Sequence, residues 1–62
     1  MIEDLLDSRA ASKYLGDIPP RTFDQWRYLG KGPAYVKVGR HVRYRRSDLD
    51  LWLTAHTVDP AD

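Results

Sequence analysis

The chain has 62 residues and no cysteine, so we expect a single domain over residues 1–62, without a disulfide framework or a thiolate zinc site. A domain of this size buries only about 60% of its unfolded surface, so its stability must be modest. No apolar run reaches the length of a signal peptide or a membrane-spanning helix, and we expect a soluble, intracellular protein. The absence of cysteine fits a reducing compartment such as a bacterial cytoplasm. The core should span about residues 5–56, with ragged ends over the first five residues and after Thr57.

The net charge of +1 conceals an uneven distribution of charged residues. Residues 21–46, the basic block, hold eight Lys or Arg against one acid, Asp24, whereas residues 1–20 sum to −2 and residues 47–62 sum to −4. A surface that serves only solubility usually intersperses both signs. A basic block between acidic ends instead predicts a face that binds a polyanion.

A first helix is predicted between Asp7 and Gly16. Asp7 is a good N-cap residue, and Gly16 is a natural C-terminal stop. Its apolar stripe at helical spacing consists of Leu6, Ala10, Ala11, Tyr14 and Leu15.

A second helix is predicted over about residues 20–29. Pro20 is well tolerated in a first helical turn, and Gly30 ends the pattern, followed by Gly32 and Pro33. At 100° per residue the helix has a core face with Phe23, Trp26 and Leu29. The opposite, polar face carries Arg21, Asp24, Gln25 and Tyr28, with Arg27 on the flank. The start of this helix is the less certain boundary, because Pro19 has no side chain that caps a helix.

A hairpin with a basic surface is predicted next, and its register depends on the loop. A two-residue loop, Gly39-Arg40, mixes apolar and basic residues on each face, because it pairs Val36 with Arg43 and Lys37 with Val42. A three-residue loop, Gly39-Arg40-His41, pairs Val38 with Val42, Val36 with Tyr44, Lys37 with Arg43 and Tyr35 with Arg45. We prefer the second register because it gives one apolar face for the core and one basic face.

A last helix is predicted after Ser47. The segment SDLD has the shape of a capping box, with Asp50 in place of Glu or Gln. Leu49, Trp52 and Leu53 form the inward stripe, and Asp48 and Asp50 suit the positive end of the helix dipole rather than a catalytic role.

The remaining residues give little reason to expect chemistry. Phe23, Trp26, Tyr44 and Trp52 fall on apolar faces and are interpreted as core residues rather than base-stacking platforms. His41 and His56 lie on separate elements, so we expect no metal site. The sequence contains no catalytic triad, glycine-rich phosphate cradle or paired inward carboxylates, and we expect neither an enzyme nor a cofactor.

Three segments together, LLDSRAASKYLG, RTFDQW and GPAYVKVGRHVRYRRSDLDLWL, resemble the excisionase-type, MerR-like winged helix-turn-helix modules. The resemblance covers about residues 5–53. It implies a mostly α fold with a small β-hairpin, in the order helix, helix, hairpin, helix. It also implies that residues 20–29 are the DNA recognition helix and that residues 34–45 are the wing. Pro19 stands where the family commonly has a capping Ser or Thr.

The candidate DNA-binding residues follow from the basic block and this resemblance. On the recognition helix they are Arg21, Thr22, Asp24, Gln25, Arg27 and Tyr28. On the wing and its flanks they are Lys31, Lys37, Arg40, His41, Arg43, Arg45 and Arg46. The width of the major groove suits a helix, and Arg is favoured in a narrow minor groove.

The function that the resemblance implies is that of a phage-type excisionase, a recombination directionality factor. Such a protein binds repeats beside an attachment site on double-stranded DNA, bends the DNA and helps an integrase to excise. We expect a monomer in free solution that assembles with neighbouring copies of itself on DNA.

Two alternatives remain open. The first is a small phage or prophage transcriptional regulator of the same fold. Only nine residues follow Leu53, and they include Pro60, so we expect no room for the long dimerisation helix of MerR-type regulators. The second alternative is a protein-interaction module whose basic face docks an acidic partner. Binding to arbitrary duplex DNA that weakens with salt would argue against this module.

Overall fold

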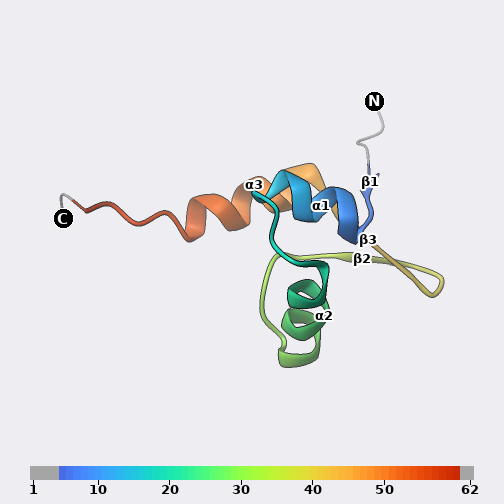
Figure 1. Ribbon diagram of the computed structural model, residues 1–62. Helices are drawn as coiled ribbons and strands as arrows, with labels where there is room; N and C mark the ends of the chain where they lie inside the picture. The colour runs from blue at the N-terminus through green and yellow to red at the C-terminus, as the bar shows by residue number, and fades with distance from the viewer. Residues whose placement is uncertain (1–4, 61–62) are drawn as a thin grey trace.

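The computed structural model describes residues 5–60 and confirms the predicted winged helix-turn-helix architecture. In chain order the described elements are β1 (Leu5–Leu6), α1 (Ser8–Tyr14), α2 (Pro20–Leu29), β2 (Val36–Val38), β3 (His41–Arg45) and α3 (Arg46–Ala55). Helices α1 and α3 lie together on one side of the β2–β3 hairpin and α2 lies on the other (Figure 1). The hairpin projects from the helices in one direction, and the end of α3 projects in the opposite one.

The ends of α1 and the turn that follows are set by local chemistry. The carboxylate of Asp7 accepts a hydrogen bond of 2.8 Å from the amide of Ala10, which confirms Asp7 as the N-cap. Gly16 (φ +92°) and Asp17 (φ +64°) then adopt left-handed backbone conformations, which Gly and Asp tolerate better than most residues. The buried hydroxyl of Ser12 donates to the carbonyl of Ile18 and ties this turn to α1.

Helix α2 has the predicted bounds. Pro19 stands at its N-cap without a side-chain hydrogen bond, and Gly30 (φ +70°) closes its C-terminus. The prediction that Leu29 lies in the core is wrong, because its side chain is 50% exposed. The physical reason is its place in the last turn of α2, which points away from the other helices (Figure 1).

The core sits where α1, α2, β3 and α3 meet. Ala11, Phe23, Tyr44 and Leu49 are at most 1% exposed. The Phe23 ring packs edge-on against Trp26 and Tyr44, with centroids 5.2 and 5.3 Å apart. Trp26 also lies 5.1 Å from Trp52 of α3. The interpretation of these four aromatics as packing residues is therefore supported, although both tryptophans are only partly buried.

The start of α3 differs from the prediction. The helix begins at Arg46, with Arg45 as an N-cap that makes no side-chain cap hydrogen bond, so Ser47 is not the cap. Strand β3 runs into α3 without a loop, and the extended backbone of Arg45 (φ −82°, ψ 139°) already forms the boundary. Asp50 accepts a hydrogen bond of 2.6 Å from the Tyr14 hydroxyl of α1. Leu53 is 39% exposed, because the second half of α3 leaves the body of the domain (Figure 1).

The hairpin has the register that the sequence argument rejected. Val36 pairs with Arg43, Lys37 with Val42 and Val38 with His41, across the two-residue loop Gly39-Arg40. Gly39 has a positive φ of 64° and Arg40 does not, the sign pattern of the II′ turns that suit two-residue hairpins. The predicted register, which gave the hairpin one wholly apolar face, is wrong. Its physical basis is missing because the projecting part of the hairpin covers little core, and Val38 is 49% exposed.

A short strand at the start of the described chain was also not predicted. Leu5 and Leu6 pair with Arg45 and Tyr44 in antiparallel register, so β1 adds a third strand to the sheet in the order β1-β3-β2. Leu5 is therefore held in the sheet by β3, and the prediction that it belongs to a ragged end is wrong. Residues 1–4 and 61–62, also predicted as ragged ends, lie outside the described part of the chain.

Candidate nucleic-acid interface

Helix α2 presents a polar face to solvent. Phe23 anchors the opposite side of the helix in the core, and this fixes the direction in which the polar side chains point. Arg21, Asp24, Gln25 and Tyr28 are exposed, and Tyr28 is 88% exposed. Thr22 is half-buried at the first turn, and Lys31 is exposed just beyond the helix. The long hydrogen-bonding side chains of α2 thus lie on the surface as the sequence predicted.

Arg27 links α2 to the base of the wing. Its Nη1 donates a hydrogen bond of 2.6 Å to the hydroxyl of Tyr44 in β3, and its Nη2 forms an ion pair with Asp24. Its guanidinium also lies 5.8 Å from the centre of the Tyr35 ring. These contacts hold Arg27 between the helix and the wing, so it sets their relative position as well as supplying charge.

Removal of the Tyr44 hydroxyl should weaken this link. We expect Tyr44→Phe to cost about 1.5–3 kcal/mol of the free energy of unfolding, because a hydrogen bond to a charged group is lost. Urea denaturation at neutral pH measures this cost. The matched control is Tyr28→Phe, whose hydroxyl belongs to an exposed side chain, and which should change little. Equal stability of the two variants would contradict the link.

Tyr44 should also make the stability of the protein depend on pH in the alkaline range. Burial raises the pKa of the Tyr44 phenol above its usual value of 10.0, although the neighbouring Arg27 opposes the shift. A raised pKa in the folded state means that Tyr44 contributes its full stability below pH 10 and loses it as the pH rises through the folded-state pKa. Wild-type stability should therefore fall more steeply above pH 10 than that of Tyr44→Phe.

The wing carries its basic residues on both faces. Alternation along the observed register puts His41, Arg43 and Arg45 on one face of the hairpin together with Val36 and Val38. Lys37 lies on the other face with Val42, so the prediction that it shares a face with Arg43 and Arg45 is wrong. Arg40 stands in the loop at the tip.

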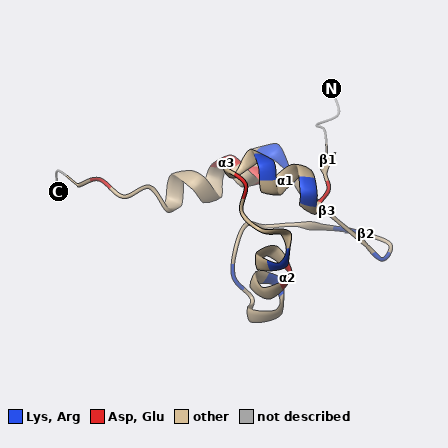
Figure 2. Ribbon diagram, in the orientation of Figure 1, with Lys and Arg blue, Asp and Glu red and all other residues tan. Residues whose placement is uncertain are grey.

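The flank of the wing is partly neutralised. Arg45 is 3.4 Å from the carboxylate of Asp48, and Arg46 lies 6.0 Å from the centre of the Tyr14 ring. Lys37, Arg40 and Arg43, nearer the tip, make no ion pair within residues 5–60, and a basic residue marks the tip of the hairpin in Figure 2.

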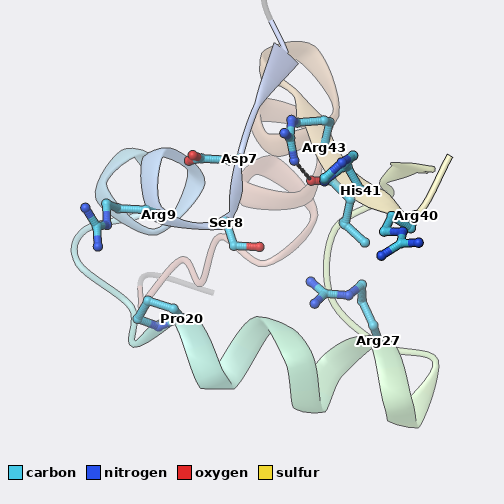
Figure 3. Close-up of a pocket in the computed structure, with 9 residues that line it drawn as sticks. Asp7, Ser8, Arg9, Pro20, Arg27, Arg40, His41 and Arg43 are labelled. Atoms are coloured by element: carbon cyan, nitrogen blue, oxygen red, sulfur yellow. Dashed lines mark hydrogen bonds between the residues drawn. The ribbon is translucent and has the colours of Figure 1, made fainter. Parts of the chain in front are cut away.

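A concavity of about 490 Å³ lies where the start of α1, helix α2 and the tip half of the hairpin approach one another (Figure 3). Its charged and polar lining includes Ser8, Arg9, Arg27, Arg40, His41 and Arg43. Ser8 and Arg9 were not predicted as candidates from the sequence, because they lie outside the basic block in a segment of negative net charge. Only the packing of α1 against β3 brings them to the wing.

The helix-turn-helix domain family matches residues 5–57, which include every described helix and strand. The chain belongs to this family of helix-turn-helix domains. The family is a DNA-binding one that includes excisionase-like proteins. A comparison with curated proteins found no match.

For a helix-turn-helix domain, α1 and α2 are the helix pair, the turn is residues 15–19, and the β2–β3 hairpin is the wing. Such domains bind DNA and are typically not enzymes. In the described part of the chain, no cluster of three or more His, Cys, Asp or Glu residues could hold a metal ion. No helix within residues 5–60 is long and apolar enough to cross a membrane.

Proposed function

We propose that the chain is a single-domain, phage-type excisionase that acts in the cytoplasm of a bacterial host. It binds repeats near an attachment site, bends the DNA and promotes integrase-mediated excision without doing chemistry itself. The observation that carries the DNA-binding part is the exposed polar face of α2 beside a basic wing, in a chain of a DNA-binding family. The excision role rests on the resemblance of residues 5–53 to excisionase-type modules.

Excision from a reporter plasmid tests this role. The plasmid carries the two hybrid attachment sites of the phage or prophage that encodes this protein. The integrase of that phage is supplied with and without this protein. We expect excision only when both proteins are present, and Arg21→Ala should lower its yield. If the protein leaves excision unchanged but alters transcription from a nearby promoter, the chain is a regulator instead.

The wing should set affinity more than specificity. Arg40 and Arg43 contact phosphates in this proposal, and phosphate contacts carry no base sequence information. If the whole domain neutralises about six phosphates, log K falls with log salt concentration at a slope of about −5. Arg43→Ala should reduce the slope by about 1 and weaken specific and random duplexes nearly alike. A loss confined to the specific site, measured by fluorescence anisotropy, would mean that the wing reads bases.

Copies of the protein should assemble side by side on DNA from free monomers. Phe23 and Tyr44 are used in the core, whereas Leu29, Leu51 and Val58 stay largely exposed. Neighbours on direct repeats need only weak contacts, because the DNA holds them at high effective concentration. The acidic ends of one copy can then face the basic block of the next, a contact that is weak away from DNA.

Sedimentation of the free protein and gel shifts on one or several repeats test this assembly. We expect a monomer in solution and cooperative complexes only on repeated sites. A stable dimer in solution, with protection of symmetric inverted half-sites, would contradict the array and favour a transcriptional regulator.

A further inference from the structure

Asp24 is the single acid of the basic block, and it stands on the exposed polar face of α2. We propose that Asp24 determines specificity by exclusion. Its carboxylate lowers the affinity of the protein for DNA of arbitrary sequence and tolerates only a cytosine at the base position that it faces. This role rests on the proposed DNA-binding function, and it is opposite to that of the basic residues, which raise affinity for every sequence.

The Asp24 carboxylate is exposed but held in place. Its side chain is 69% exposed, whereas that of its ion-pair partner Arg27 is 20% exposed. Nη2 of Arg27 donates to Oδ1 of Asp24, and Nη1 donates a hydrogen bond of 2.6 Å to the hydroxyl of Tyr44. Tyr44 is 1% exposed and belongs to the core. Arg27 thus ties the carboxylate to the core, so Asp24 cannot swing away from an approaching anion without breaking this link.

The second carboxylate oxygen, Oδ2, is left for a ligand. Within residues 5–60, Arg27 is the only group that donates to the Asp24 carboxylate, and it does so at Oδ1. An ionised carboxylate only accepts hydrogen bonds, so Oδ2 can bind a donor but repels an acceptor. In the major groove cytosine offers its N4 amino group, whereas guanine and thymine offer acceptors and adenine places the acceptor N7 beside its amino group. Cytosine is therefore the base that suits this oxygen.

The position of Asp24 on α2 turns this preference into a penalty on other sequences. Asp24 lies about one turn after Arg21, in the first half of α2, and the N-terminal part of the recognition helix contacts base edges. Without a donor opposite, the carboxylate loses water for no replacement partner and faces phosphates of the same charge. Binding to arbitrary DNA therefore weakens more than binding to the target, and the ratio of the two affinities rises.

Competition binding with Asp24→Ala tests this role. The selected duplex is the tightest binder of the wild-type protein from in vitro selection, and its competitors are its single-base variants and a random duplex. We expect Asp24→Ala to bind the random duplex about fivefold more tightly, because a unit charge close to a phosphate is removed. One cytosine that the wild type prefers about fivefold or more should lose its preference. Asp59→Ala makes the same change in net charge beyond α3, which projects away from the wing (Figure 1), and should keep that preference.

A cytosine analogue that lacks the N4 amino group isolates the contact. Placed at the preferred cytosine, it should weaken binding of the wild type and leave that of Asp24→Ala unchanged. Equal effects of the analogue on the two proteins, or equal gains on random DNA for Asp24→Ala and Asp59→Ala, would overturn the proposal and leave DNA binding intact. Weaker binding of Asp24→Ala to every duplex would mean that Asp24 only positions Arg27, which also overturns it. Failure of the wild type to bind any duplex would overturn DNA binding itself.

Discussion

Gly32→Ala should leave a large fraction of the protein unfolded at room temperature. An added Cβ would lie 2.8 Å from Cε3 and 2.9 Å from Cβ of Trp26, and Gly32 has a left-handed φ of +84°. Trp26 has little room to move, because Phe23 and Trp52 pack on it. Left-handed strain of about 1–2 kcal/mol and overpacking of about 1–3 kcal/mol together approach the stability of about 3–5 kcal/mol that a core of this size supplies.

Gly30→Ala is the matched control. Gly30 also has a left-handed φ, of +70°, but an added Cβ there would meet nothing within 4 Å. This variant should carry the backbone strain alone, without the steric conflict. Its midpoint of urea unfolding should therefore lie between those of wild type and Gly32→Ala. Equal midpoints for the two variants would contradict the steric conflict with Trp26.

Arg21→Ala and Gln25→Ala should each abolish preference for one base in the target site. Both side chains are exposed on the polar face of α2, with Arg21 next to the N-terminus at Pro20 and Gln25 about one turn further along. The N-terminal part of this helix contacts base edges in helix-turn-helix proteins. Arg suits guanine and Gln suits adenine through paired hydrogen bonds, each worth about 1–3 kcal/mol of discrimination. That corresponds to a loss of about fivefold to 150-fold at the preferred base.

Competition between the selected duplex and its single-base variants measures this discrimination. Tyr28→Ala, on the same face but near the far end of α2, serves as the control and should keep the base preferences. If Gln25→Ala retains the wild-type preference at every position, Gln25 does not read a base.

The helix pair could be predicted because its boundaries depend on neighbouring residues. Asp7 caps α1 through an amide three residues away, and Gly30 ends α2 through its own backbone conformation. Phe23 faces the core because the helical repeat places it on the side of α2 opposite the polar side chains. Such local signals hold whatever the rest of the chain does.

The predictions that were wrong or missing concern segments whose structure depends on contacts with residues distant in the sequence. Leu5 is ordered by pairing with Arg45, 40 positions along the chain, and no local pattern indicates a strand of two residues. The predicted register of the hairpin requires a buried face along its whole length, whereas burial reaches only the Tyr44 end. Arg9 was missed as a candidate for the same reason, since only tertiary packing brings α1 to the wing.

Mapping of amide chemical shifts on titration with duplex DNA tests the central claim, that α2 and the wing together form the DNA-binding surface. The isotopically labelled protein is titrated with the selected duplex at low salt. We predict the largest shifts over residues 20–29 and 37–45, with smaller ones at Ser8 and Arg9, and little change over residues 50–60. Shifts concentrated on the second half of α3, with the polar face of α2 unaffected, would contradict the account.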